Sequence, residues 1–230
     1  MYQKENRTWN GNMQISHVLY RVDDLHKAVK SMENAGFIVE YGTKPEKAYN
    51  AIIWFEEGIF IELFKNSELA SWVKCIMKLF GYESILKRIK KWEEIETGWC
   101  EWSLETKLIN LNDQKQLLRA KKIPFKFHKA KRTDITEKKL KWELLIPHSI
   151  DFPFLMSTYT PNPRPPKINH PNGIKGISKL IVGKKNLDVN LLQHLLEEPK
   201  ELELVEGSKG LQGIEFVDST LNMESILFNQ

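Results

Sequence analysis

The sequence predicts an α+β protein built from three βαβββ units. Short stretches in which apolar and polar residues alternate are typical of strands, and segments with apolar residues three or four positions apart are typical of helices. In the 230 residues these two patterns recur three times in the same order, a strand, a helix and three strands. Repetition of a whole supersecondary unit is a strong indication of architecture, so it sets the expected fold.

The first unit is expected over residues 15–66, after a polar segment at 1–14. Asp23 and Asp24 suit the start of its helix and Gly36 suits its end. The expected elements are a strand at 15–22, a helix at 23–36 and strands at 37–41, 50–55 and 58–64. Residues 67–97 then turn helical and basic, which indicates an insertion that is either a lid over a pocket or a pair of covering helices.

The second unit is expected over residues 98–160 and the third over 173–230, with a Pro-rich, extended link at 161–172. In the second unit we expect strands at 98–106, 124–128, 139–147 and 152–160, a helix at 111–121 and a solvated basic loop from Lys129 to Lys141. In the third we expect strands at 176–183, 200–207, 211–218 and 223–229 and a helix at 187–198.

Composition favours an ordinary folded protein, with 41% hydrophobic and 28% charged residues. The net charge of +4 is small for this length, so neither nucleic acid nor a membrane is an expected partner. Cys75 and Cys100 provide no disulfide framework and no paired-cysteine metal motif. The polar N-terminus lacks the apolar core of a signal peptide, and no apolar run is long enough to span a bilayer. These features predict a cytoplasmic protein.

Several segments resemble the vicinal-oxygen-chelate superfamily, which includes glyoxalase I, extradiol dioxygenases and bleomycin-resistance proteins. They are ISHVLYRVDDLHKAV at 15–29 and IFIELF at 59–64. The segments GWCEWSLET, PFLMS and HPNGIKGISKLIVG are similar to its glyoxalase-like-domain branch. The resemblance implies that curved mixed sheets from two units form a bowl-shaped pocket. It also implies that one divalent metal ion takes ligands from the first and last strand of each unit.

In the first unit, the resemblance places the metal ligands at His17 and Glu62. Alternation along the strand puts His17 on one face with Ile15, Leu19 and Arg21, away from the apolar face that the helix is expected to cover. An imidazole and a carboxylate are common ligands of divalent metals. The alternative is that His17 is an interior histidine with satisfied hydrogen bonds and that Glu62 pairs with a cation such as Arg21.

In the other units, the matching positions depart from the metal-binding pattern. Counting back from the second helix places Glu101 near the first-strand position and Ser157 near the last-strand position, while the third unit has Lys179. Serine and lysine are poor replacements for a carboxylate and an imidazole, so we expect a weak or incomplete metal site. Glu101 is the predicted catalytic residue that moves a proton, and the alternative is a solvent-facing glutamate.

Two functions of different class follow. The first is a glyoxalase-like metal-dependent lyase, isomerase or dioxygenase acting on a small molecule with vicinal oxygens. The second is a non-catalytic binding or resistance protein, which holds its ligand against aromatic side chains at Trp54, Phe60, Phe64, Trp99 and Trp102. A nucleic-acid binder ranks third, since the basic loop is accompanied by no recognition motif.

Because the number of units is odd, the sequence also predicts what covers the apolar sheet face of the third unit. If the first two form one bowl, the third has no partner in the chain, and an open apolar sheet face is usually covered. We therefore expect either a homodimer in which third units face each other or a third unit packed on the back of the bowl.

Overall fold

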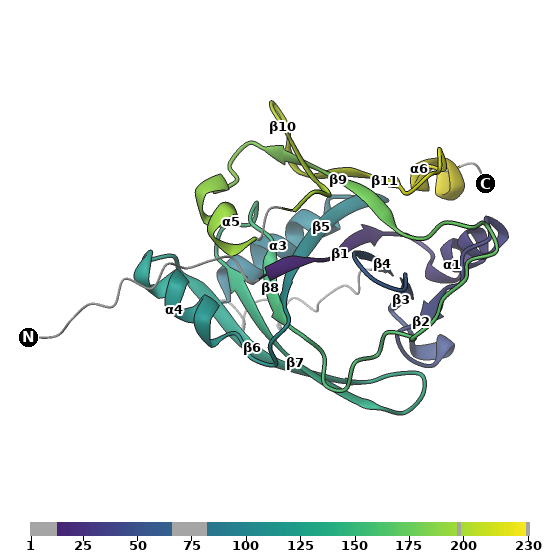
Figure 1. Ribbon diagram of the computed structural model, residues 1–230, viewed down its shortest axis with the longest axis horizontal. Helices are drawn as coiled ribbons and strands as arrows, with labels where there is room; N and C mark the ends of the chain where they lie inside the picture. Colours follow the sequence, from purple (N-terminus) through teal and green to yellow (C-terminus); the bar gives the residue numbers. More distant parts are fainter. Residues whose placement is uncertain (1–12, 66–81, 197–198, 229–230) are drawn as a thin grey trace, which may run out of the picture.

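The computed structural model describes residues 13–65, 82–196 and 199–228 and has an α+β architecture in which one large sheet curls into a half-barrel (Figure 1). The expected strand 223–229 is instead a helix, α6. Asn222 caps it by accepting a hydrogen bond from the Ser225 amide at 3.2 Å. Met223 is buried, while Ile226 and Leu227 pack against the core at helical spacing, so the third unit is βαββα.

The elements of the three units follow one another along the chain. The first unit contains β1 (Met13–Arg21), α1 (Leu25–Asn34), β2 (Glu40–Tyr41), the 3-10 turn η1 (Pro45–Lys47), β3 (Asn50–Ile53) and β4 (Phe60–Phe64). The helix α3 (Glu83–Glu93) leads to the second unit, with β5 (Gly98–Thr106), α4 (Asn112–Ala120), β6 (Phe125–Thr133), β7 (Lys139–Pro147) and β8 (Phe154–Ser157). The third unit contains β9 (Ile177–Lys184), α5 (Val189–Leu195), β10 (Leu202–Val205), β11 (Lys209–Phe216) and α6 (Met223–Phe228).

The first two units share one eight-stranded sheet with the order β2-β3-β4-β1-β5-β8-β7-β6. Their first strands, β1 and β5, pair antiparallel at the centre, and each pairs in parallel with the last strand of its own unit, β4 or β8. The sheet curls until its two edges approach each other. Arg132 Nη1 on the edge strand β6 donates a hydrogen bond to the Gly42 carbonyl, just beyond the other edge strand β2, at 3.3 Å. In Figure 1 the β6–β7 hairpin accordingly extends toward β2. The concave face of this sheet is called the bowl below.

The third unit packs on the convex face, on the back of the bowl. Its strands form a separate sheet, β10-β9-β11, and Leu180 and Val182 of β9 belong to the same core as Val18 of β1 and Leu104 of β5. Figure 1 shows β9 and β11 beside β1 and β5. One of the two expected arrangements of the third unit is therefore present. The homodimer stays a prediction.

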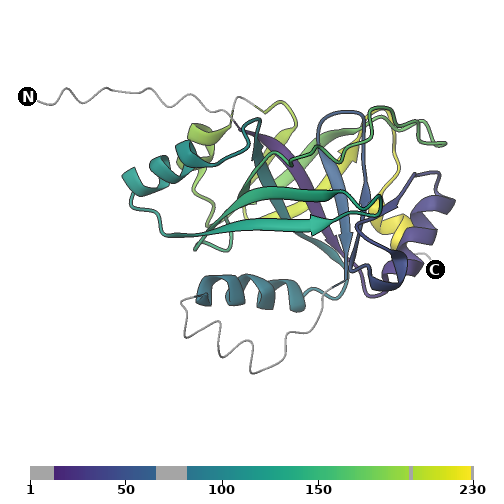
Figure 2. The ribbon, with the colours of Figure 1, turned by 90° about the horizontal axis from the view of Figure 1, so that it is seen from below.

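The helix α3 covers one end of the bowl, and Figure 2 shows it lying along one side of the strands. Its Trp92 packs edge-on against Phe64 of β4, with the ring centroids 5.7 Å apart. Residues 67–81 of the expected insertion lie outside the described part of the chain. Within the described ranges, no helix is long and apolar enough to cross a membrane.

Candidate functional site

A bulge in β1 builds the polar part of the bowl. The register with β5 shifts between Ile15, which pairs with Leu104, and His17, which pairs with Ser103, so Ser16 is an extra residue. Ile15 consequently lies in the main core, while Ser16 and His17 both contact Ser103 or Met156 on the concave side. Strict alternation, which placed Ile15 on the face of His17, is therefore wrong for Ile15.

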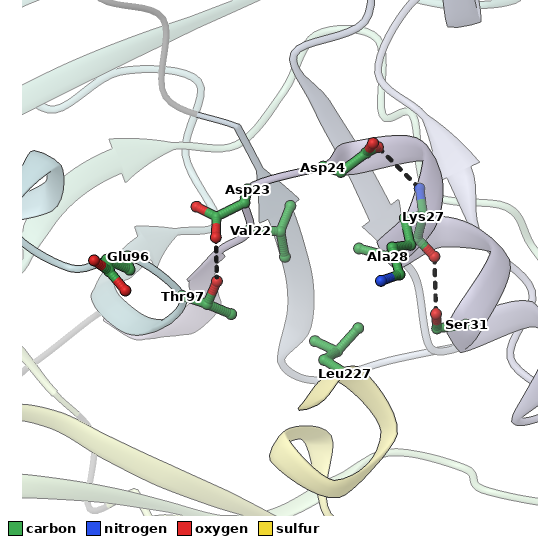
Figure 3. Close-up of a pocket in the computed structure, with 9 residues that line it drawn as sticks. All are labelled: Val22, Asp23, Asp24, Lys27, Ala28, Ser31, Glu96, Thr97 and Leu227. Carbon is green, nitrogen blue, oxygen red and sulfur yellow. Dashed lines mark hydrogen bonds between the residues drawn. The ribbon is translucent and has the colours of Figure 1, made fainter. Parts of the chain in front are cut away.

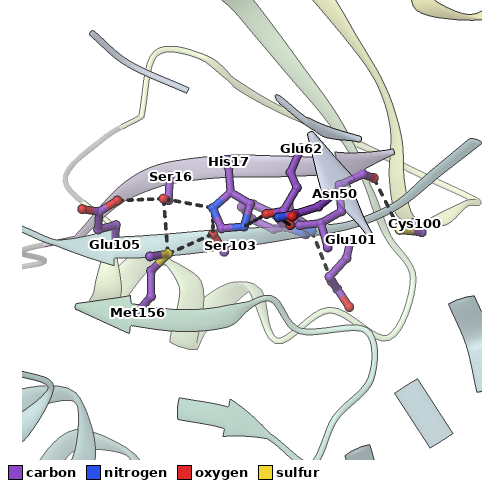
Figure 4. Close-up of polar contacts among 11 residues, drawn as sticks. Ser16, His17, Asn50, Glu62, Cys100, Glu101, Ser103, Glu105 and Met156 are labelled. Carbon is purple, nitrogen blue, oxygen red and sulfur yellow. Dashed lines mark hydrogen bonds and ion pairs between the residues drawn. The ribbon is translucent and has the colours of Figure 1, made fainter. Parts of the chain in front are cut away.

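The structure brings His17 and Glu62 together on the concave side. His17 Nε2 lies 3.8 Å from Glu62 Oε2, and Asn50 Nδ2 donates a hydrogen bond to Glu62 Oε1 at 2.7 Å (Figure 4). The His17 ring stacks on Phe60 with the ring centroids 4.6 Å apart. The alternative partner of Glu62, Arg21, instead lies 4.0 Å from Asp23. The carboxylate of Glu62 is thus oriented from one side by an amide and faces an imidazole on the other.

Burial shifts the pKa of both groups. His17 is 3% exposed, and burial, together with the positive charge of Arg132, lowers its pKa to about 3, so the imidazole is neutral at physiological pH. Its Nδ1 lies 2.8 Å from Ser103 Oγ and 3.1 Å from Ser16 Oγ. Burial raises the pKa of Glu62, against the opposing effects of the Asn50 hydrogen bond and Arg132. A raised pKa makes this carboxylate a stronger base than an exposed one.

The register identifies the equivalents of His17 and Glu62 in the second unit. His17 pairs with Phe60, and Glu62 follows two residues later; Ser103 pairs with Phe154, and Met156 follows two residues later. The equivalent side chains are therefore Ser103 and Met156, which contact each other and the His17 side of the bowl (Figure 4). Counting along the sequence gave Glu101 and Ser157 instead, because it did not use the pairing of the strands.

These four side chains do not fit a complete divalent-metal site. His17 and Glu62 are suitable ligands, but the hydroxyl of Ser103 is bonded to His17, and the thioether of Met156 is a soft donor that hard divalent ions do not favour. Among the described residues, no three His, Cys, Asp or Glu side chains are arranged to hold an ion. Two protein ligands are fewer than structural or catalytic metal sites normally supply. The roles of His17 and Glu62 as metal ligands remain predictions.

Glu101 lies under α3 rather than in the open part of the bowl. Its side chain is 2% exposed and forms a buried ion pair with Arg88 of α3. Arg88 Nη2 also donates hydrogen bonds to the carbonyls of Ser149 and Phe152 at 2.8 and 2.9 Å. A solvent-facing Glu101 is therefore excluded, and its carboxylate attaches α3 to the sheet.

The predicted aromatic residues separate into three environments. Trp54 and Phe60 pack together with centroids 4.3 Å apart, next to His17. Phe64 is covered by Trp92 of α3. Trp99 packs against Tyr20 and Trp102 lies in the main core, both on the convex side. The structure thus brings Trp54 and Phe60 to the candidate site, and leaves Trp99 and Trp102 behind the sheet.

A cavity of about 390 Å³ lies at the rim of the bowl. It is lined by Trp54, Phe60, Glu105, Tyr159 and Arg164, among others. Arg164, from the Pro-rich link, donates hydrogen bonds to the Phe55 and Gly58 carbonyls, both at 2.8 Å. The sequence did not predict Arg164 at the site, because neither a strand pattern nor a motif connects the Pro-rich link to the sheet.

A second cavity, of about 440 Å³, lies between α1, α6 and the segment before β5 (Figure 3). Two of its acidic side chains already have partners: Asp23 accepts a hydrogen bond from Thr97 Oγ1 at 3.3 Å, and Asp24 accepts one from the Lys27 amide at 3.0 Å. These contacts explain Asp24 as a helix cap and Asp23 as a group that fixes the segment before β5. The candidate site is therefore the bowl.

Residues 15–198 match the model of a family described as a glyoxalase-like domain. The chain belongs to this glyoxalase-like family. The match covers the two units that form the bowl together with β9 and α5. No curated protein matches the chain.

Two solved structures with TM-scores above 0.5 have a similar fold, and a third is similar to a lower degree. A hypothetical protein from Staphylococcus aureus is 18% identical, with a TM-score of 0.64 over 90% of this chain and 93% of that one. A Mn(II)-bound glyoxalase from Novosphingobium aromaticivorans is 9% identical, with a TM-score of 0.52 over 93% of this chain and 68% of that one. An extradiol ring-cleaving dioxygenase from B. fuscum is 9% identical with a TM-score of 0.48, over 90% of this chain and 57% of that one. The predicted resemblance to the glyoxalase-like branch of the vicinal-oxygen-chelate superfamily is confirmed by the family match.

Proposed function

We propose that this glyoxalase-like protein binds an oxygen-bearing small molecule in the bowl and moves a proton on it with Glu62. The observation that carries the proposal is the meeting of His17 and Glu62, 3.8 Å apart on the concave face. They come from separate strands and share an environment with Trp54 and Phe60, which provide apolar contact for a ligand.

The surroundings of Glu62 suit a general base. Asn50 holds Oε1, so Oε2 is directed toward His17 and the bowl. Removal of a proton next to a carbonyl is the step that lyases and isomerases of this kind require, and a base with a raised pKa performs it more readily near neutral pH. His17, which is neutral, can donate one hydrogen bond to a ligand oxygen without a change in charge.

A divalent ion is an accessory in this proposal. The Mn(II) of the glyoxalase neighbour suggests one, but here only His17 and Glu62 offer suitable ligands among the described residues. We expect weak binding whose occupancy depends on added metal, and no step assigned to Glu62 requires it.

A non-catalytic binding protein is the second candidate. It is favoured by Ser103 and Met156, which stand where the second unit would otherwise provide ligands. In that case the cavity of about 390 Å³ beside Trp54 and Phe60 holds a ligand without chemistry.

Hydrogen–deuterium exchange separates the two candidates. The full chain, treated with chelator or loaded with Mn²⁺, is incubated in D₂O with hydroxyacetone and other hydroxycarbonyl compounds, and loss of the α-proton signal is followed by NMR. We expect exchange that Glu62→Gln abolishes and that Glu201→Gln, a change at an exposed carboxylate outside the bowl, leaves intact. Ligand binding without exchange in the wild type would reject the enzyme and leave the binding protein.

A further inference from the structure

Arg132 is a cation on the concave side that the proposed function does not use. It lies on β6 between Lys131 and Thr133, which are both exposed, whereas Arg132 is half-buried. Its Nη1 donates the 3.3 Å hydrogen bond to the Gly42 carbonyl. Its Nε is fully buried and has no hydrogen-bond partner among the described residues. The guanidinium therefore retains an unused donor inside the curled sheet.

Gly42 allows Arg132 to approach the candidate site. A Cβ at Gly42 would lie 2.6 Å from Arg132 Nη1 and 2.1 Å from Asn50 Oδ1, closer than atoms pack. The absence of a side chain thus lets the guanidinium and the Asn50 amide meet over this residue. Asn50 holds Glu62 through its other end, and its Oδ1 is itself buried without a partner in the described structure. Arg132 is consequently separated from Glu62 by one side chain.

Arg132 has no counterion in contact. No carboxylate of the described residues lies within 4.0 Å of it, in contrast to Arg88, which is paired with Glu101. The positive charge of Arg132 acts on Glu40 and Glu62, but neither carboxylate is in contact with it. A half-buried cation with no paired anion is costly, and an anionic ligand would remove that cost.

We propose that Arg132 binds the carboxylate of a small organic acid in the bowl. The proposal rests on the proposed function, since it names the ligand of that same site. A planar guanidinium suits a carboxylate because it offers two parallel hydrogen bonds. Trp54 and Phe60 contact the apolar part of the ligand, and a second ligand oxygen lies toward Glu62.

Matched probes test the charge requirement. Mandelate and its uncharged amide, mandelamide, have the same ring and hydroxyl group. Each is titrated into the chelator-treated full chain, and binding is measured by tryptophan fluorescence and calorimetry. We expect mandelate to bind at least tenfold more tightly than mandelamide. Arg132→Gln should abolish that preference, Arg132→Lys should keep part of it, and Lys131→Gln, on the same strand but exposed, should change nothing.

Gly42→Ala provides a second variant, because the new methyl group would displace both the guanidinium and the Asn50 side chain without removing the charge of Arg132. It should also reduce the preference for the acid, and thermal unfolding confirms that each variant is folded. Equal binding of acid and amide by the wild type, or an unchanged preference in Arg132→Gln, would overturn the inference while leaving the bowl as a binding site. Binding of neither probe would reject this class of acid, whereas the exchange experiment on hydroxycarbonyl compounds tests Glu62 separately.

Discussion

The two halves of the bowl have one architecture and different chemistry. In each half the first strand pairs in parallel with the last, and the paired positions are His17 with Phe60 and Ser103 with Phe154. Behind these strands the two halves contribute to one apolar core, for example through Val18 and Trp102. On the concave side the first half has an imidazole and a carboxylate, and the second has a hydroxyl and a thioether.

This difference teaches which constraints the fold imposes. Convex-face side chains must fill a shared core at close packing, so both halves retain large apolar groups there. Side chains in the bowl face a ligand or one another, so they can differ without loss of the fold. The carboxylate Glu101 illustrates the point, because in the second half an acidic residue fixes α3 whereas in the first half Glu62 remains directed at the site.

The largest expected effect separates these two carboxylates. Glu101→Gln leaves the guanidinium of Arg88 buried without its counterion, which we expect to lower the free energy of unfolding by about 3–5 kcal/mol. Glu62→Gln removes a carboxylate whose pKa is already raised by burial, so it should change stability much less. Urea unfolding of both variants measures the difference. Equal losses would show that Glu62 is as structural as Glu101.

A smaller effect concerns the pH dependence contributed by His17. Its pKa is lowered to about 3 in the folded protein, so below pH 6.5 the unfolded chain binds more protons at this residue. The stability contributed by the neutral His17 is present above pH 6.5 and is lost as the pH falls toward 3. Between pH 6.5 and 5 this amounts to about 2 kcal/mol, at about 1.4 kcal/mol per pH unit.

The comparison of wild type with His17→Gln isolates the contribution of His17 to the pH dependence of stability. Burial raises the pKa values of Glu62 and Glu105, so these groups add stability as the pH falls, and they do so in both proteins. Urea unfolding at pH 7 and pH 5 should show a smaller acid-induced loss in the variant. Parallel losses in the two proteins would mean that His17 titrates normally and is accessible to water.

The third prediction concerns a substitution that gives the second half of the bowl a carboxylate like that of the first half. Met156→Glu places a carboxylate at the position equivalent to Glu62, beside Ser103 and facing His17, so three suitable ligands would then converge. We expect Mn²⁺ to bind at least tenfold more tightly than to the wild type, as measured by calorimetry. Ser157→Glu, at the position obtained by counting, is the control and should not improve binding. Tighter Mn²⁺ binding by Ser157→Glu than by Met156→Glu would show that Ser157, one residue further along β8, is the equivalent of Glu62.

Much of the fold was predictable because its signals are local. The order of strands and helices in the first two units follows from periodicity, and the βαβββ pattern with its curved mixed sheet is confirmed. The exception, α6, is a short apolar segment in which strand and helix patterns cannot be distinguished by length. Its Asn222 cap and the acidic Glu224 in the first turn are local signals that favour a helix.

The candidate site was predictable only in part, because its geometry depends on register and on distant contacts. Strand alternation placed His17 and Glu62 on one surface, but the bulge at Ser16 moved Ile15 to the core. The second-half equivalents, Ser103 and Met156, are identified only by the pairing of the strands. The pairing of Arg88 with Glu101 joins a helical insertion to a strand across the fold, and no sequence pattern indicates it.

The smallest expected effect is the change in stability when the exposed lysines of β6 are replaced, compared with Arg132 on the same strand. The basic segment Lys129 to Lys141 was expected to be a solvated loop, yet most of it forms β6 and β7. Replacing the exposed Lys129 and Lys131 with Ser should change the free energy of unfolding by less than about 0.5 kcal/mol, since exposed charges contribute little. Arg132→Ser should cost more, about 1–2 kcal/mol, because its hydrogen bond to Gly42 joins the two edges of the sheet. Urea unfolding of the double lysine variant and of Arg132→Ser measures both values. If all three positions prove equally neutral, Arg132 does not close the sheet in solution, and its side chain is free in water like those of its lysine neighbours.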